Sequence, residues 1–464
     1  MHLAGPNKRP RRADPAPFWT DHFVFSGNLT LKLPVGHYTF EVERGPEYLN
    51  CEGYFTIDRF ADDSKEIQLR RFTDMSAEGW WSGDLYVRRP ARDAEILMAA
   101  DDLHVAQMVT WWNDKSDWAG RPLPKNPLVQ FDSNRWYQLL AGGYSRSGTE
   151  AICCNLPAPM LWSRDETQSA SLVQQLLKAR KECPDLWIDL ASSYGWDLPV
   201  LAALGQINSI EIANSHFCRK TMLADEAGGK RRDPGQYQGP AGFARWSQDI
   251  YFKLLECGLR IPPSAGSGSG VSPNPVGYNR MYVHLDGQLD YPEWWRNLRA
   301  GQVFITNGPL MLPKVEGQLP GYVFHADEGK ELDLEIALTF STRDPISYLE
   351  IVQDGGVRHS LRFEDYAKSG RLPKLHFDHS GWFALRAVTD VSETYRFAMT
   401  GPYYVEVGYK PRISKKAAQF FLDWMYERAR QLAIDDADQR REVMGHYRKA
   451  RDFWQDLVDR ANVP

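Results

Sequence analysis

The sequence predicts an α/β protein: a distorted barrel of about seven strand–helix units, flanked by two small antiparallel β-sandwiches and followed by a C-terminal helical hairpin. In the middle of the chain, apolar segments of strand length alternate with amphipathic segments of helix length. These strands are almost continuously apolar, which is typical of parallel strands covered on both faces. Before and after this region, apolar and polar residues alternate, as in half-buried antiparallel strands. No G-x-G-x-x-G motif follows the first central strand, so a barrel is favoured over a dinucleotide-binding sheet.

The N-terminal segment, residues 1–76, is predicted to form the first β-sandwich. Apolar residues alternate with polar ones from Leu29 to Leu33 and again from Tyr38 to Val42, with a Pro-Val-Gly turn between the two runs. The segments YFTIDRF and KEIQLRRF continue the same period. We therefore expect short antiparallel strands throughout this segment.

Residues 77–319 carry the predicted barrel. The expected strands have the sequences GDLYV, VAQMVT, AICCNL, DLWIDL, INSIEIA, LRI and QVFIT. Helical segments lie between them, and the clearest one places Phe243, Trp246, Ile250 and Leu254 on one face. Because strands this apolar are buried on both faces, we expect a parallel sheet wrapped by helices.

Two further segments complete the predicted fold. Residues 320–410 return to two-residue alternation in LDLEIALTF, SYLEIVQD and GWFALRAVTD, which predicts the second β-sandwich. Residues 411–464 carry two helical segments, the first of which Ser414 is suited to cap. In the second, Tyr447 and Trp454 belong to one apolar face. We expect an αα-hairpin packed on the body of the protein.

The composition of the 464 residues is that of an ordinary globular protein. Lys and Arg total 55 against 60 Asp and Glu, so the net charge of −5 does not favour a nucleic-acid partner. No apolar run reaches the length of a membrane span, and the N-terminus lacks the apolar core of a signal peptide. These features predict a soluble protein, cytoplasmic as the chain stands, or periplasmic or secreted if a leader has been removed. The adjacent Cys153 and Cys154 are expected to be buried thiols in a strand.

The segment GDLYVR is the first candidate for chemistry. On a strand, Asp84, Tyr86 and Arg88 share one face, and three polar side chains directed into a barrel are hard to explain by packing. Arg88 beside Tyr86 is expected to favour the phenolate and so to lower the pKa of the phenol. Asp189 lies in an apolar strand and needs a partner if it is buried, and Arg88 is the expected one.

Other candidate residues follow strands at the edge where parallel barrels carry their reacting groups. His216 and Asp189 are suited to act as bases. Flat aromatic rings suit the faces of sugars or aryl groups, and arginines suit anions. We expect the following residues to contact a substrate: Trp111, Trp112, Asn113, Trp196, Asn214, Arg219 and Arg280.

Several longer phrases resemble the CehA/McbA family of metallohydrolases, whose centre is a distorted (β/α)7 barrel of the PHP type. These phrases are GWWSGDLYVRRP, DDLHVAQMVTWWND, LPVLAALGQINSIEIANSHFCR, LRIPPSAGSGSGVSPNPVGYNRMYVHLDG and LRAGQVFITNGPLMLPKVEGQLPG, and the similarity covers about residues 78–325. The resemblance implies a PHP-like barrel and hydrolysis of an ester, amide, carbamate or phosphoester bond.

The chain departs from the family at the positions that bind metal. The family's opening motif is Gly-Asp-Leu-His-x-His, and Tyr86 and Arg88 occupy its two histidine positions. A guanidinium has no lone pair for a cation, and a tyrosine ligates only as the phenolate. The family's later motifs, Thr-Asp-His-Asn and Asp-x-His, align with residues 110–113 and 265–270, which retain none of their carboxylate or imidazole ligands. Three ligand candidates remain, enough for a single open zinc or manganese site: Asp84, Asp189 and His216.

Three functions are compatible with these residues. The first is a hydrolase of the resembled type with most metal ligands replaced, which acts on a small ester, amide, phosphoester or glycoside with no metal or one divalent metal. The second is a metal-independent carbohydrate-active enzyme of lyase or glycosidase type, in which Tyr86, His216 and Arg88 perform acid–base chemistry. The third is a non-catalytic, sugar-binding relative of the family. In each case the expected partner is a small molecule or saccharide, without nucleic acid or membrane, and a homo-oligomer is compatible with the sequence.

Overall fold

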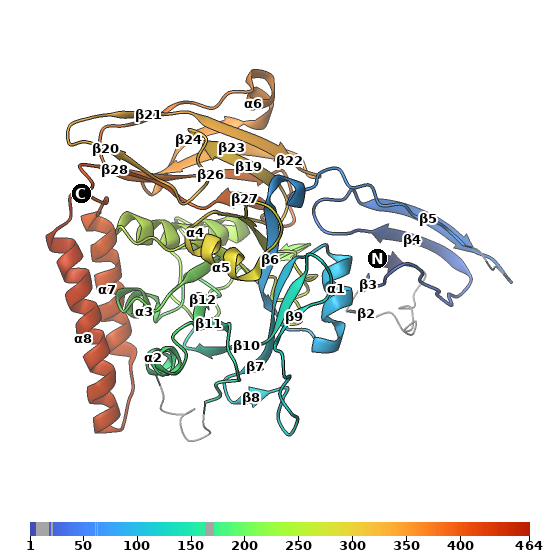
Figure 1. Cartoon of the computed structure of the whole chain (residues 1–464), viewed down its shortest axis with the longest axis horizontal. Helices are drawn as coiled ribbons and strands as arrows, with labels where there is room; N and C mark the ends of the chain where they lie inside the picture. Colours follow the sequence, from blue (N-terminus) through green and yellow to red (C-terminus); the bar gives the residue numbers. More distant parts are fainter. Residues whose placement is uncertain (6–17, 20–21, 61, 63, 163–170) are drawn as a thin grey trace.

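The protein is a mixed α/β structure in which a central sheet is flanked by two further groups of strands and by a pair of long helices (Figure 1). The structure is a computed structural model that describes residues 1–5, 18–19, 22–60, 62, 64–162 and 171–464. The N-terminal sheet, the C-terminal strands and the helical pair lie on different sides of the central sheet (Figure 1). The predicted α/β class is therefore confirmed.

The N-terminal segment forms one antiparallel sheet with the strand order β2-β3-β1-β4-β5, in place of the predicted sandwich. The alternation from Tyr38 to Val42 lies in β4, whose alternate side chains are buried. The run from Leu29 to Leu33 and the segment KEIQLRRF are not strands, because neither finds a neighbouring strand for its backbone groups apart from one bridge at Arg71. The strands are β1 (His2–Ala4), β2 (Phe18–Trp19), β3 (His22–Phe23), β4 (Gly36–Val42) and β5 (Cys51–Ile57).

The central sheet is mixed, so the prediction of an all-parallel sheet is wrong. The ladders β6–β7, β7–β10, β12–β13 and β13–β16 are parallel, whereas β10–β11 and β11–β12 are antiparallel. A two-residue turn at Ser147 and Gly148, both with positive φ, reverses the chain between β10 and β11. The strands are β6 (Trp80–Val87), β7 (Val105–Trp112), β10 (Trp136–Arg146), β11 (Thr149–Cys154), β12 (Trp187–Leu190), β13 (Ser209–Ala213) and β16 (Pro263–Ala265).

Strand ladders continue from β6 through β17, β18 and β27 into the C-terminal strands. The two small pairs β19–β22 and β21–β25 lie beside these strands and share an apolar core with them. These strands are β17 (Arg280–His284), β18 (Val303–Thr306), β19 (Leu310–Val315), β20 (Val323–Ala326), β21 (Leu332–Leu334), β22 (Ile336–Ser341), β23 (Ile346–Gln353), β24 (Gly356–Arg362), β25 (Leu375–Phe377), β26 (Gly381–Thr389), β27 (Phe397–Thr400) and β28 (Tyr403–Val407). Four short strands complete the set: β8 (Lys115–Ser116), β9 (Leu128–Gln130), β14 (Phe217–Cys218) and β15 (Thr221–Met222).

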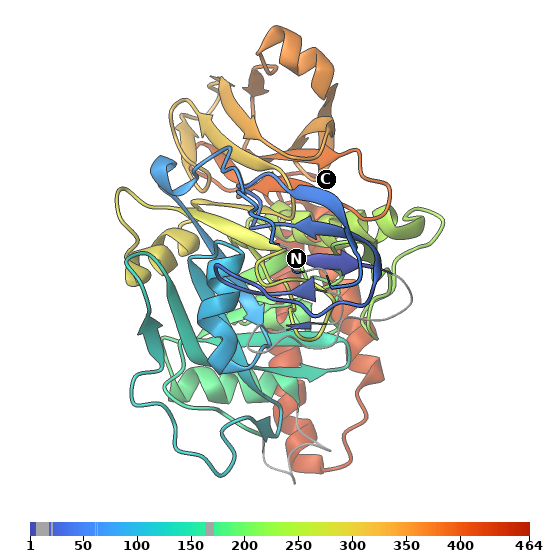
Figure 2. The same ribbon diagram turned by 90° about the vertical axis from the view of Figure 1, so that its right-hand side faces the viewer.

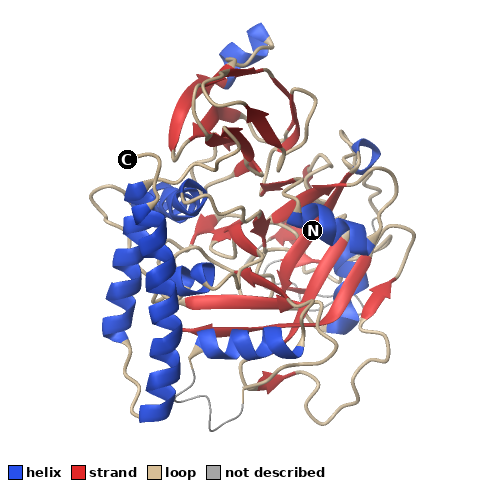
Figure 3. Ribbon diagram, turned by 60° about the vertical axis from the view of Figure 1, so that its left-hand side comes forward, coloured by secondary structure: helices blue, strands red, loops and turns tan. Residues whose placement is uncertain are grey.

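The helices follow the predicted periodicity. The C-terminal hairpin of α7 and α8 is confirmed, and the Ser414 hydroxyl accepts a hydrogen bond from the Ala417 N–H at 3.3 Å (Figure 3). Tyr447 and Trp454 are buried, as their spacing predicts. The α-helices are α1 (Ala94–Ala100), α2 (Leu172–Glu182), α3 (Leu198–Ala203), α4 (Gly239–Glu256), α5 (Tyr291–Arg299), α6 (Phe363–Ser369), α7 (Lys415–Gln431) and α8 (Ala437–Asp459), and two short 3₁₀ helices span Ser76–Glu78 and Ala91–Asp93.

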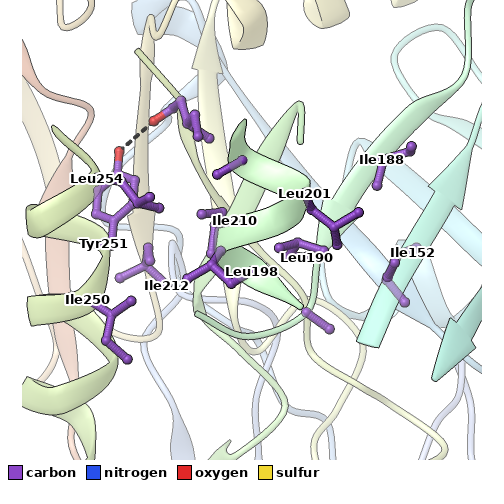
Figure 4. Packing of buried hydrophobic residues seen from close by; sticks show 14 of the residues in the cluster. Ile152, Ile188, Leu190, Leu198, Leu201, Ile210, Ile212, Ile250, Tyr251 and Leu254 are labelled. Carbon is purple, nitrogen blue, oxygen red and sulfur yellow. Dashed lines mark hydrogen bonds between the residues drawn. The ribbon is translucent and has the colours of Figure 1, made fainter. Parts of the chain in front are cut away.

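The main core lies where α3 and α4 pack on the central strands (Figure 4). Ile188 and Leu190 of β12 and Ile210 and Ile212 of β13 are fully buried and occupy one face of each strand, while the buried carboxyl groups of Asp189 and Glu211 lie on the other face. Each such side chain contributes about 1.5–3 kcal/mol by leaving water. The six cysteines are free thiols, with Cys153 and Cys154 buried in β11 as expected. Within the described ranges, no helix has both the length and the apolar character needed to cross a bilayer.

Candidate functional site

One edge of the central sheet collects the polar and aromatic residues of several strands. β6, β7, β12 and β13 run in one direction and end at this edge, and the reversed strand β11 begins there. This topology brings together residues that are far apart in the sequence. They are Arg88 after β6, Trp112 in β7, Glu150 in β11, Tyr194 after β12 and His216 after β13.

Tyr86 and Trp112 form an aromatic stack at this edge. Their ring centroids are 5.7 Å apart and the ring planes differ by 6°. The Arg88 guanidinium carbon lies 5.6 Å from the centroid of the Trp112 ring. The Trp112 indole N–H donates to the Ser145 hydroxyl at 2.9 Å, which holds the ring in place. A flat aromatic surface with an adjacent exposed cation results, and this combination suits a ring that carries an anionic group.

Glu150 adds a carboxyl group to this surface. Burial raises its pKa, and Arg88 opposes that rise by favouring the charged form. Among the residues that the structure describes, the Glu150 carboxylate and the Arg88 guanidinium make no hydrogen bond or ion pair. We call Tyr86, Arg88, Trp112 and Glu150 the strand-end cluster.

Arg88 acts on the pKa of Tyr86 in the expected downward direction, but other influences outweigh it. Burial raises the pKa of Tyr86 well above its ordinary value, and the negative charges of Glu150 and Glu211 raise it further. Arg88 acts in the opposite direction but is the smallest of these influences, because its guanidinium is exposed to solvent while the phenol is buried. The phenol is therefore neutral and able to donate a proton.

His216 lies at the same edge of the sheet, in the segment between β13 and β14. Its Nδ1 lies 2.8 Å from the Leu223 carbonyl oxygen, which only accepts hydrogen bonds, so Nδ1 carries a proton and donates it to this contact. The ring stacks on Phe243 at 5.5 Å and meets the edge of Tyr194 at 5.9 Å. The buried Asn214 accepts a hydrogen bond from the His216 N–H at 3.1 Å and so positions the loop instead of facing solvent.

Asp84 is fully buried and is used to position backbone. Its carboxylate accepts hydrogen bonds from the N–H groups of Tyr86 at 3.0 Å, Ser267 at 3.0 Å and Gly277 at 2.8 Å. Burial raises the pKa of Asp84, while these hydrogen bonds act in the opposite direction. The side chain thus joins β6 to the loop that follows β16.

Asp189 does not pair with Arg88, contrary to expectation. The hydroxyls of Ser209 and Ser264 donate to its carboxylate, the latter at 2.5 Å. The carboxyl group of Glu211, in the adjacent strand β13, is its other partner. Burial raises the pKa of Asp189 to about 6 and that of Glu211 well above its ordinary value, where the charge of Asp189 adds to the effect. Two buried carboxyl groups in contact cannot both ionise readily, so they share a proton.

Sequence reasoning missed Glu211 and Glu150. The signal for Glu211 was a charged residue inside the apolar run SIEIA, which is the same signal that identified Asp189. Glu150 could not be found in this way, because only the reversed direction of β11 brings it to the edge.

The three metal-ligand candidates belong to separate networks. Asp84 accepts backbone N–H groups, Asp189 contacts two serines and Glu211, and His216 holds a loop carbonyl through Nδ1. In the described part of the chain, no group of three His, Cys, Asp or Glu side chains is arranged to hold an ion.

Three of the predicted substrate contacts make specific contacts within the protein. Trp111 is buried, and its indole N–H donates to the Leu140 carbonyl at 3.0 Å. Asn113 adopts φ +51° and accepts the Ser145 N–H at 2.9 Å, so it shapes a turn. The Trp196 ring packs edge-on against Trp424 of α7. Side chains of these types occur both in cores and in binding sites, and sequence position alone does not separate the two.

Arg219 and Arg280 line a separate cavity of about 260 Å³. No member of the strand-end cluster contributes to its lining. The predicted site residues are therefore divided between two places. Comparisons with protein-family models, curated proteins and solved structures give no match for this chain.

Proposed function

We propose that the protein is a metal-independent enzyme that performs acid–base chemistry on an anionic saccharide or a similar hydroxylated anion at the strand-end cluster. One observation carries this proposal. The Arg88 guanidinium and the Glu150 carboxyl group lie near the stack that Tyr86 forms with Trp112. Neither of these groups nor the Tyr86 hydroxyl has a hydrogen-bond partner among the described side chains. Neighbouring groups of opposite charge, such as Arg88 and Glu150, usually form an ion pair. Because these two do not, they are candidates for contacting a ligand.

The proposal includes a PHP-like distorted (β/α)7 barrel related to the CehA/McbA family. Two features support it. The strands β6, β7, β10, β12, β13 and β16 share one direction, and a single bridge between Val87 and Ser269 joins the regions of the first and last of them. In such barrels the carboxyl ends of the strands carry the active site, which is the edge where the strand-end cluster lies.

Each member of the cluster has a role that follows from its chemistry. Arg88 binds the anionic group of the substrate, and the Trp112 ring packs against the sugar face. Glu150 in its carboxylate form accepts a proton from the substrate, and Tyr86 donates its phenolic proton to the departing oxygen. The raised pKa of Tyr86 keeps that proton in place before the reaction. His216 Nε2 is a second group at the same edge that can accept a proton.

A second candidate function is sugar binding without turnover. The observation that favours it is the burial of Tyr86, whose exposed fraction is 2%. A phenol this enclosed contacts a substrate only at its hydroxyl edge, and a purely stacking role for the Tyr86–Trp112 pair explains its burial equally well.

The deciding experiment compares Tyr86→Phe and Arg88→Gln with the exposed control Arg92→Gln, using uronate-containing oligosaccharides and aryl glycosides as substrates. We expect Tyr86→Phe to lower kcat by about 100-fold with little change in KM, because a general acid acts in the transition state. Arg88→Gln is expected to raise KM by about tenfold or more, because it removes the charged contact to the anion.

The outcomes separate the two functions. Wild-type binding without turnover, lost in Arg88→Gln, supports the binding function. Wild-type turnover that is unchanged in both variants contradicts the enzyme proposal, and the absence of both binding and turnover contradicts both functions.

Removal of metal provides an independent test. We expect turnover to survive dialysis against a chelator, because no step assigned to the cluster uses a cation. Turnover that is lost on dialysis and restored by zinc or manganese would instead favour the metal-dependent hydrolase implied by the family resemblance.

A further inference from the structure

A second, charged cavity lies where three parts of the molecule meet. The N-terminal sheet, the loop before β17 and the C-terminal strands enclose a volume of about 260 Å³. Figure 2 shows the N-terminal sheet in front of the central sheet and below the C-terminal strands. We call this volume the inter-sheet cavity. Its charged lining includes the four arginines Arg219, Arg280, Arg343 and Arg396.

Two of these arginines are neutralised by carboxylates. Arg219 donates to Glu41 of β4 at 2.6 Å and to Glu43, which directly follows β4, at 3.0 Å. Arg396 donates to Asp344 at 2.8 Å. The Arg219 ion pairs connect the N-terminal sheet to the loop between β14 and β15, whereas the Arg396–Asp344 pair joins two loops of the C-terminal strands.

The other two arginines have no carboxylate partner among the described residues. Arg343 donates to the Asn50 side chain and to the Tyr48 carbonyl oxygen. Arg280 is fully buried and donates to the carbonyl oxygens of Asp101, Asp102 and Gly277. Arg280 and Arg343 therefore form no ion pair with a described carboxylate, although the lining also includes the acidic residues Glu41, Glu43, Glu52, Asp101 and Asp344.

Polar atoms without partners lie in the same lining. The Arg219 Nη1, Arg396 Nε and Tyr278 Oη atoms are buried and have no well-aligned hydrogen-bond partner among the described residues, although the Arg396 and Tyr278 side chains lie near each other. Buried donors are normally satisfied, so three of them around one cavity indicate a missing acceptor. Burial lowers the pKa of Arg343, while the nearby charges of Glu43 and Asp344 raise it and those of Arg396 and Arg219 lower it further.

Asp101 gives the cavity a hydrogen-bond acceptor. Its carboxyl group lines the cavity and makes no hydrogen bond or ion pair with the described residues. A carboxylate at this position accepts hydrogen bonds from the hydroxyl groups of a ligand, while the nearby arginines bind the anionic group of the same ligand. Burial raises the pKa of Asp101 to about 7. The exposed Glu52 lies at the rim.

We propose that the inter-sheet cavity binds a small oxyanion that carries hydroxyl groups, that is, a phosphorylated or carboxylated sugar-like polyol. The oxyanion contacts the Arg343 guanidinium. Its oxygen atoms accept hydrogen bonds from Arg219, Arg396 and Tyr278. The Asp101 carboxylate accepts a hydrogen bond from a hydroxyl group of the ligand. The volume lies just below the usual range for drug-sized ligands, about 300–1,000 Å³, and so limits the ligand to about one sugar unit. The proposal is independent of the function assigned to the strand-end cluster, because the two sites share no residue.

Isothermal titration calorimetry of the full chain tests this site with ribose 5-phosphate, gluconate and inorganic phosphate. We expect ribose 5-phosphate or gluconate to bind at least about tenfold more tightly than inorganic phosphate, because only these two offer hydroxyls to Asp101. Binding of one and not the other identifies the oxyanion as phosphate or carboxylate.

Three variants locate the binding. Arg343→Gln is expected to weaken it by about tenfold or more, and Tyr278→Phe by about threefold, because each removes a donor to the oxyanion. The exposed Arg358→Gln is the matched control and is expected to leave the affinity unchanged. Arg88→Gln is also expected to leave it unchanged, which separates this site from the strand-end cluster. If Arg343→Gln unfolds, Tyr278→Phe decides, because it removes only a hydroxyl group.

Three results would overturn the proposal. The first is that none of the three probes binds. The second is that inorganic phosphate binds as tightly as the hydroxylated probes, which would indicate an adventitious ion only. The third is that the affinity is unchanged in Tyr278→Phe and in folded Arg343→Gln.

Discussion

At the scale of single residues, the placement of charge inside the central sheet is the main departure from expectation. Asp189 and Glu211 are both fully buried, and the two carboxyl groups contact each other in adjacent strands. Neither has an arginine or lysine partner among the described side chains. Such a pair is stable only while it holds a proton, so it makes the folded state sensitive to pH.

The Glu211→Gln variant tests this sensitivity. Both carboxyl groups have a higher pKa in the folded state than in the unfolded state, so the unfolded chain loses its protons first as the pH rises. The free energy of unfolding of the wild type should therefore fall from about pH 4 upward. Glu211→Gln removes one titrating group and should be about 2 kcal/mol more stable than the wild type at pH 8, with little difference at pH 4.

Urea denaturation at pH 4, 6 and 8 measures the effect, with the exposed Glu364→Gln as control. A difference between Glu211→Gln and the wild type that does not change with pH would contradict the shared proton.

At the scale of elements, the β10–β11 turn controls which residues reach the candidate site. Ser147 and Gly148 both have positive φ and reverse the chain within two residues. The reversal places the start of β11, and with it Glu150, at the edge where the other strands end. Without this turn, β11 would present its carboxyl end, and Glu150 would lie at the opposite edge.

Gly148→Ala should therefore destabilise the protein strongly. Gly148 has φ +68°, and an added Cβ would lie 2.1 Å from the Gly229 nitrogen, a backbone atom that cannot move alone. We expect a loss of about 2–3 kcal/mol from strain and overlap together. The control is Gly329→Ala, where φ is +75° and nothing lies within 4 Å of the added Cβ, so only about 1 kcal/mol of strain remains. Thermal unfolding measures the stability of both variants. An equal loss of stability in Gly148→Ala and Gly329→Ala would show that overlap with Gly229 does not contribute to the destabilisation.

At the scale of the whole molecule, a buried ion pair joins the C-terminal hairpin to the central sheet. The Arg428 guanidinium of α7 donates to Asp197 at 2.8 Å, and the Tyr447 hydroxyl of α8 donates to the same carboxylate at 3.1 Å. Asp197 directly precedes α3, so these contacts tie three helices together. The Trp454 indole N–H adds a bond to the Pro199 carbonyl at 2.9 Å.

Arg428→Met should destabilise the protein by about 3 kcal/mol, because it leaves the Asp197 carboxylate buried without its cation. The double variant Asp197→Asn/Arg428→Met should recover most of this loss, since the remaining amide is neutral and still accepts the Tyr447 hydroxyl. Urea denaturation of the single and double variants forms the required cycle. If the double variant has the same free energy of unfolding as Arg428→Met, then packing of the arginine side chain, and not its charge, stabilises the contact between the hairpin and α3.

Much of the fold could be predicted from local patterns. The face of α4 formed by Phe243, Trp246, Ile250 and Leu254 is buried as its spacing indicates, and the cap at Ser414 lies where expected. The predicted β-sandwich of residues 1–76 failed, because alternation from Leu29 to Leu33 does not provide a partner strand. For the candidate site, Tyr86, Arg88, Trp112 and His216 were predicted at the correct edge, whereas Trp111 was assigned to a substrate and lies in the core.

By itself the sequence determined the α/β class, the helices and the apolar central strands, because periodicity is a property of neighbouring residues. Only the tertiary structure decided the direction of β11, the pairing of Asp189 with Glu211 and the isolation of Arg88 from Asp189. These features depend on which strands lie side by side and which way each one runs. Side chains from different strands have no fixed spacing along the chain, so their contacts are set by the fold and not by the local pattern.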